Sequence, residues 1–201
     1  MLDGLIAPVA RVLIRRARAR PYFHLSDYME RWWLFGAPRQ GDTRPRWRGR
    51  IHCTRRSDLD RALHDHPWAN ASLLLEGGYW EIVQGAYQDA LERAYGDLHG
   101  LPEVMLALHT TIHATPGSAL PRAQRRAYAA HGVHWRGVGS VVFRSATTLH
   151  RLVLPAGGVA WSLFIMAPKV REWGFLDPLH GWIHHSEYAV QLGRDQQGRD
   201  A

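Results

Sequence analysis

Histidine is the residue type best able to do chemistry in this chain, which has 13 histidines and a single cysteine among 201 residues. Histidine is an acid–base group near neutral pH and the commonest metal ligand. One cysteine, Cys53, can form no internal disulfide and cannot build a cysteine-rich metal site. Any metal must therefore be held by His, Asp, Glu or amide side chains, and the histidine spacing has to identify the site.

Two histidines, His64 and His66, lie in the segment HDHPW. On an extended strand, residues i and i+2 point to the same face with Cα atoms about 6–7 Å apart, so one metal ion can reach both imidazoles. Asp65 between them points to the other face. His150 follows a predicted strand and turn and begins another strand, from which it could supply a third ligand.

The glycine spacing around these histidines resembles the two motifs of the cupin superfamily, G-x5-H-x-H-x3,4-E-x6-G and G-x5-P-x-G-x2-H-x3-N. Gly77 lies eleven residues after His66, and His150 lies eleven residues after Gly139. The phrases SDLDRALHDHPW, LLEGGYWE and GWIHHSEY also resemble a group of bacterial and phage cupin-like proteins. The resemblance covers residues 47–83 and 134–188 and implies a small β-barrel of jelly-roll type.

The chain departs from the second motif at three positions, which carry Ser145, Thr147 and Leu154 in place of Pro, Gly and Asn. The resemblance implies metal ligands at His64, His66 and His150. The glutamate ligand of the first motif would fall at Asn70 or Ala71, and neither is a carboxylate. The predicted site therefore has three histidines alone, or is completed by the Asn70 carbonyl or by water.

Three neutral imidazoles leave a divalent ion at charge +2 with open positions for substrate or O2. This ligand set resembles that of thiol dioxygenases, which are cupins with three histidines on Fe(II). It also suits Zn(II), whose bound water reaches a pKa near ~7 in such sites. We expect one divalent metal ion, Fe(II) first, with Zn, Mn or Ni as alternatives.

Other side chains have positions that suit support of the site. The carboxylates of Asp58, Asp60 and Asp65 could orient the imidazoles through hydrogen bonds. Trp68 and Tyr79 could line the mouth of the barrel. Two further histidine pairs are expected to be surface groups rather than metal ligands. They are His109 with His113 and His184 with His185.

The resemblance implies a metal-dependent enzyme acting on a small molecule inside the barrel, with Fe(II) dioxygenase chemistry favoured over an isomerase or hydrolase on another ion. A non-catalytic, ligand-binding or regulatory cupin is the alternative. A net charge of +7 and arginine clusters at 11–20 and 39–50 raise a third class, a protein associated with nucleic acid. Those clusters lie outside the two motif segments and match no known nucleic-acid motif, so we expect no such partner. A homodimer is expected from the resemblance alone.

The predicted fold is mainly β, a single cupin-type barrel over residues 47–188. It is preceded by a helical, basic arm at 1–46, interrupted by a helical insertion at 84–132 and followed by a flexible tail at 189–201. Alternating apolar runs predict strands at 48–53, 70–76, 78–83, 138–143, 149–153 and 159–166. Helical spacing predicts helices at 2–13, 26–34, 87–98, 101–112 and 122–130.

The insertion is expected to be either a lid over the barrel pocket or a dimer element. No run approaches the ~20 apolar residues of a membrane span, and acidic Asp3 precedes the basic residues, unlike a signal peptide. We therefore expect a cytoplasmic protein with no membrane partner.

Overall fold

A computed structural model describes residues 2–20, 25, 28–38, 44–58, 62–94 and 97–188. Over these residues the fold is mainly β, as predicted. The strands are β1 (Met29–Phe35), β2 (Arg48–Thr54), β3 (Leu63–His64), β4 (Asn70–Val83), β5 (Val133–Gly137), β6 (Val141–Arg144), β7 (His150–Val153), β8 (Ala160–Met166), β9 (Gly174–Asp177) and β10 (Gly181–His184). The helices are α1 (Leu2–Arg18), α2 (Ala86–Arg93), α3 (Glu103–Ala114) and α4 (Arg122–Ala129), with single 3-10 turns at Leu98–Gly100 and Gly117–Ala119.

Strand β4 is long enough to belong to two antiparallel sheets. Its first half pairs with β6 and β8, and its second half pairs with β5 and β7. The pairing with β8 shifts register between Leu74 and Glu76, and Gly77 follows with a positive φ of 67°. A Cβ atom at Gly77 would lie 1.9 Å from the carbonyl oxygen of Val159, so only glycine fits. The prediction of two separate strands at 70–76 and 78–83 is therefore wrong, because a single strand continues through Gly77.

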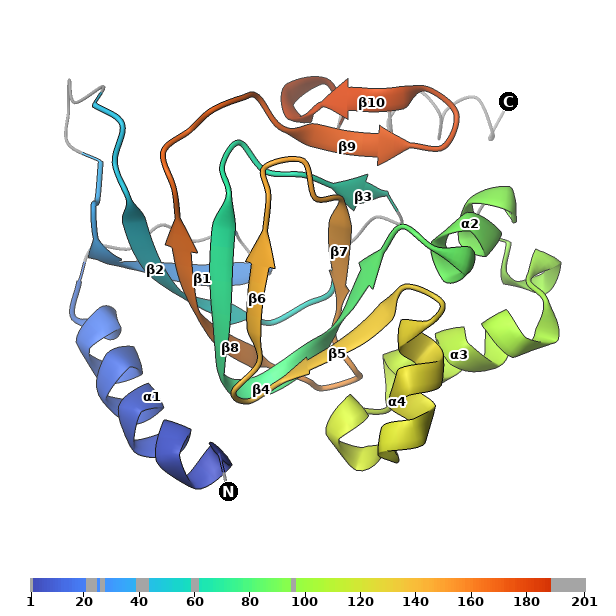
Figure 1. Ribbon diagram of the computed structural model, residues 1–201, viewed down its shortest axis with the longest axis horizontal. Coiled ribbons are helices and arrows are strands. Elements are labelled where there is room, and N and C mark those ends of the chain that lie inside the picture. The colour runs from blue at the N-terminus through green and yellow to red at the C-terminus, as the bar shows by residue number, and fades with distance from the viewer. Residues whose placement is uncertain are drawn as a thin grey trace.

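The strands follow the order β1-β2-β8-β4-β7-β3-β9-β10, with β5 and β6 also paired to β4. Among the described strands this path is open, with β1 and β10 at its ends. Figure 1 shows β2, β8, β4 and β6 side by side, with the β9–β10 hairpin lying across one end of the strands. The segments of both predicted motifs thus enter one β structure, as the cupin resemblance implies.

Helix α1 covers the outer face of the sheet that contains β1, β2 and β8. Ala10, Ile14 and Ala17 are buried against this sheet, in one core with Ile51 and Trp161. Alternation along β2 explains the contact, because every second residue of a strand points to the same face. The amphipathic N-terminal helix predicted from the sequence therefore exists and packs on its own domain. No helix among the described residues is long and apolar enough to cross a membrane.

The helices of the insertion lie together on the opposite side of the molecule (Figure 1). Leu91, Leu108 and Ile112 share a buried core with Trp80 and Ile82 of β4. None of the described residues in the insertion lines the cavity described below. The described helices of the insertion therefore pack on the sheet and not on the cavity, and their removal would expose Trp80 and Ile82 to water. A dimer element on these helices stays a prediction.

Residues 29–35 form strand β1 and pair with β2. The sequence analysis placed them in the N-terminal arm, where they overlap the helix predicted at 26–34. The apolar run Trp32-Trp33-Leu34 misled the prediction, because it lacks strict alternation. The pairing separates the run into two faces: Trp32 packs under α1, whereas Trp33 is opposite Arg50. Strands β3, β5, β9 and β10 were also not predicted, and the predicted tail at 189–201 lies outside the described residues.

Candidate metal centre and cavity

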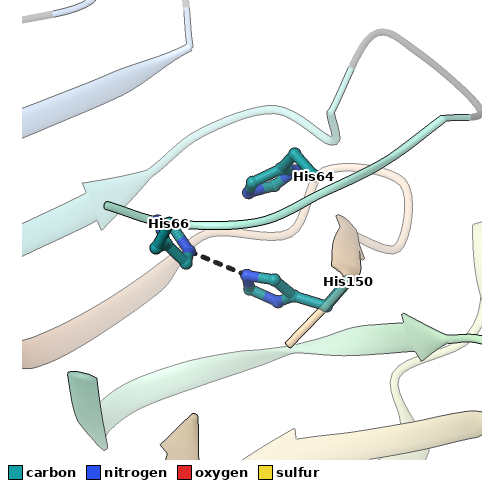
Figure 2. A group of neighbouring side chains, drawn as sticks. All are labelled: His64, His66 and His150. Atoms are coloured by element: carbon teal, nitrogen blue, oxygen red, sulfur yellow. Dashed lines mark hydrogen bonds between the residues drawn. The ribbon is translucent and has the colours of Figure 1, made fainter. Parts of the chain in front are cut away.

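Three histidines come together between β3 and β7, as the sequence predicts. His64 ends β3 and is paired in register with His150, the first residue of β7. His66 follows two residues later, and its ring centroid lies 5.3 Å from that of His64 and 5.1 Å from that of His150. The Nε2 atoms of His66 and His150 are 2.9 Å apart and share a hydrogen bond (Figure 2).

One ligand nitrogen from each histidine lies within 4.8 Å of the other two. Nitrogens that bind one ion at about 2.1 Å are at most about 4.2 Å apart, and about 3 Å apart when they subtend a right angle. The 2.9 Å separation of the His66 and His150 nitrogens fits the second case. Small rotations of the rings would bring all three nitrogens onto one ion, so this donor set fits a divalent metal.

A buried carboxylate stands behind His150, and the sequence analysis missed it. Glu81 Oε1 lies 3.1 Å from His150 Nδ1, off line for a good hydrogen bond but close enough for a strong electrostatic contact. Arg144 Nε and Arg136 Nε donate to the two oxygens of Glu81 at 2.6 Å each. Burial alone would raise the pKa of Glu81, but His150, Arg144 and Arg136 together lower it below its ordinary range. The ionised carboxylate favours a proton on Nδ1 of His150 and leaves Nε2 available for a metal.

A second carboxylate, Asp58, stands behind His64. Asp58 Oδ2 lies 3.7 Å from His64 Nδ1 and accepts a hydrogen bond of 2.6 Å from the backbone N–H of Leu152. The hydroxyl of Tyr28 donates to the other oxygen of Asp58. Of the three aspartates expected near the histidines, Asp58 therefore has the predicted position. Asp60 lies outside the described residues.

The histidines open onto a cavity of about 350 Å³, a size typical of small-molecule sites. Aromatic and aliphatic side chains make up much of its wall, together with hydroxyl and basic groups. The lining residues are Leu25, Tyr28, Met29, Arg31, Arg50, His52, Thr54, His64, His66, Pro67, Trp68, Ser72, Tyr79, Arg144, His150, Leu152, Ser162, Phe164 and Trp173. Trp68 and Tyr79 thus line the cavity, as predicted.

We expected Asn70 and Asp65 to take part in the site, but the structure places both side chains elsewhere. The side-chain oxygen of Asn70 accepts a hydrogen bond of 3.4 Å from Arg144, and Asn70 is not among the residues that line the cavity. Asp65 is buried on the other face of its strand, where it accepts hydrogen bonds from Arg171, from the backbone N–H of Gly174 and from Trp182. Its carboxylate anchors the β9–β10 hairpin and leaves the orientation of the histidines to Glu81 and Asp58.

A second group of possible ligands, Glu172, His184 and His185, lies near the surface. Glu172 is exposed and forms an ion pair with Lys169. His185 stacks on Trp173, with ring centroids 4.6 Å apart. This second group does not line the cavity, and both C-terminal histidines are partly buried rather than the exposed surface pair that we predicted.

Burial keeps the histidines of the site neutral at neutral pH. It lowers the pKa of His64 and His66, and the pKa of His150 falls to about 4 from 6.5. In the unfolded chain His150 takes up a proton near pH 6.5, whereas the folded protein resists protonation until about pH 4. Acid therefore favours the unfolded state over this interval.

We expect the metal-free protein to lose stability as pH falls from 7 to 5. His150 alone accounts for about 2 kcal/mol of this loss, because its folded-state pKa is about 4 rather than 6.5. Urea unfolding in EDTA at pH 7, 6 and 5 measures the effect. The exposed His99→Gln variant should follow the wild-type pH profile, while His150→Gln should show a shallower one. Equal slopes for wild type and His150→Gln would contradict this account.

Comparison with known proteins adds little beyond the general fold. No family profile matches the chain, and no curated protein is similar to it in sequence. Among solved structures, the polyketide cyclase RemF from Streptomyces resistomycificus matches with 13% identity over 87% of this chain and 89% of its own, at a TM-score of 0.46. The DMSP lyase DddQ from Ruegeria pomeroyi DSS-3 matches with 10% identity over 83% of this chain and 71% of its own, at a TM-score of 0.45.

A cupin 2 conserved barrel domain protein from Rhodopseudomonas palustris matches with 14% identity over 76% of this chain and 72% of its own, at a TM-score of 0.38. At identities of 10–14% and TM-scores below 0.5, the three matches say nothing about the activity of this chain. The histidine cluster, its two carboxylates and the cavity have to identify the chemistry.

Proposed function

We propose that the chain is a metal-dependent enzyme that acts on a small molecule in the cavity. In this proposal His64, His66 and His150 hold one divalent ion. Fe(II) is favoured because the three-histidine set resembles that of the cupin dioxygenases, with Zn, Mn or Ni as the other candidates. The observation that carries the proposal is the convergence of three neutral imidazoles, from β7 and from the segment that begins with β3, at the wall of a cavity.

The surroundings of the histidines support a working metal site rather than a chance cluster. Metal-binding histidines usually donate their second ring nitrogen to a carboxylate or carbonyl, which fixes the ring and its tautomer. Glu81 and Asp58 have these positions behind His150 and His64. A bound divalent ion would supply Lewis acidity at its open positions and, if it is iron, redox chemistry with O2.

The side chains around the cavity have separate roles in this proposal. Trp68, Phe164 and Trp173 form apolar walls, which exclude water and so strengthen electrostatic interactions inside. Burial raises the pKa of Tyr79, so its hydroxyl keeps its proton at neutral pH and can donate to a bound molecule. Tyr28 holds Asp58, and through it the His64 ring, in place.

Nitric oxide tests whether the site can hold iron with an open position. Protein loaded anaerobically with Fe(II) should bind nitric oxide and give the electron paramagnetic resonance signal of an iron–nitrosyl adduct. The same treatment of His66→Ala should give no protein-bound signal, while exposed His99→Ala should behave as wild type. Full iron occupancy without nitric oxide binding would contradict oxygenase chemistry and favour zinc chemistry or simple ligand binding.

A further inference from the structure

The wall of the cavity formed by β1 and β2 carries basic side chains. Along β2, Arg50, His52 and Thr54 line the cavity, whereas Ile51 and Cys53 between them are buried under α1. The alternation of the strand therefore turns one end of a predicted arginine cluster, 39–50, into the interior rather than toward solvent.

Two of the cavity-lining residues of β2 each have a buried polar atom without a hydrogen-bond partner. Nε of Arg50 and Nε2 of His52 have no hydrogen bond to any residue that the structure describes. His52 is only 8% exposed, and Arg50 lies with its guanidinium carbon 3.9 Å from the ring centre of Trp33. Buried donors are rarely left unsatisfied in folded proteins, and both of these side chains belong to residues that line the cavity.

The described lining of the cavity is basic and holds no acidic side chain. Among the described residues that line the cavity, arginine and histidine supply the ionisable cationic groups, and none carries a carboxylate. Burial, followed by the neighbouring charges of Arg31 and Arg48, lowers the pKa of Arg50 to about 10. At neutral pH Arg50 is still charged, and an anion beside it would relieve the repulsion.

We propose that Arg50 and His52 form a subsite for the carboxylate of a small organic acid, with an apolar body that lies along Phe164. A monoanion is sufficient to balance the charge of Arg50, because burial lowers the pKa of His52 and keeps its ring neutral at neutral pH. The ring of Phe164 stacks on His52 at 4.7 Å and lies 6.1 Å from the ring of His66. An acid bound at the subsite therefore extends past Phe164 toward the histidine cluster.

Only one part of this inference rests on the proposed function, namely that the bound acid is a substrate. Its binding chemistry needs no metal, so it can be tested with metal-free protein. The probes are 4-phenylbutyrate and its neutral amide, which have the same shape and differ in charge. Isothermal titration calorimetry in EDTA should show 4-phenylbutyrate binding at least tenfold more tightly than the amide, because charge-assisted hydrogen bonds are strong in buried sites.

Matched variants locate the subsite. Arg50→Met keeps the aliphatic stem and should weaken binding of 4-phenylbutyrate about tenfold or more, whereas binding of the amide should stay the same. His52→Phe keeps the stacking on Phe164 and should weaken carboxylate binding by a smaller factor. Arg55→Met removes an equal charge from an exposed pair with Glu30 and should leave binding unchanged.

Two outcomes would overturn the subsite: equal binding of acid and amide by the wild-type protein, or equal losses in Arg50→Met and Arg55→Met. The first comparison uses the unmodified chain, so it is decisive even if a variant fails to fold. His150→Ala should keep carboxylate binding while losing metal. If the wild-type protein binds the acid but no metal, the subsite stands and the proposed enzyme function fails.

Discussion

Replacing His150 by Ala should abolish stable metal binding. The imidazole of His150 comes from β7, whereas His64 and His66 belong to one segment around β3. Without it, two neutral ligands are left, too few for a typical protein metal site. We expect metal affinity to fall by more than the roughly 10–100-fold loss typical of removing a supporting partner.

Elemental analysis after dialysis gives the measurement, on protein purified without a histidine tag. Wild type and the exposed His99→Ala control should each keep one ion per chain, and His66→Ala should lose it as His150→Ala does. Unchanged metal stoichiometry in both cavity variants would exclude the histidine cluster as the metal site. Circular dichroism shows whether each variant has kept its fold.

Replacing Glu81 by Gln should affect stability and metal binding together. Glu81 is 1% exposed and holds Arg144, which is 5% exposed. Removing the charge leaves a buried guanidinium uncompensated, and breaking such pairs costs about 3–5 kcal/mol. His150 also loses the carboxylate behind its Nδ1 atom, so metal affinity should fall about 10–100-fold.

Glu76→Gln is the matched control, because Glu76 lies on the same strand and is exposed. It should change the free energy of unfolding by less than about 0.5 kcal/mol and leave metal affinity unchanged. Urea unfolding and competition with a metal chelator measure the two effects. If Glu81→Gln resembles Glu76→Gln in both, the buried network supports neither the fold nor the site.

The sequence predicted the parts of the site that depend on local spacing. The predicted proximity of His64 and His66 is confirmed, because their ring centroids lie 5.3 Å apart, although only His64 belongs to a strand. The partnership with His150 came from the cupin resemblance, and the register of β3 with β7 agrees with it. Trp68 and Tyr79 were placed correctly because each is close in sequence to a motif residue.

The supporting residues could not be predicted, because their partners come from distant strands. Glu81 lies on β4, fifteen residues after His66, and its importance depends on Arg136 and Arg144 from β5 and β6. The cupin motif places its glutamate at Asn70 or Ala71, where this chain has no carboxylate, so the resemblance did not point to Glu81. An acidic residue in an apolar stretch was the available signal: the segment GGYWEIV puts one charge among six uncharged residues.

β4 pairs with segments that follow it at very different distances along the chain. β8 lies between β2 and β4 and pairs with both, yet it begins at Ala160, well after Val83 ends β4. During synthesis, β2 and β4 therefore emerge from the ribosome long before the strand that joins them. Until then their edges are open to pairing with other chains. The helices of the insertion are synthesised in this interval and pack on Trp80 and Ile82 in the folded protein, so they are available to cover these two side chains before β8 is made.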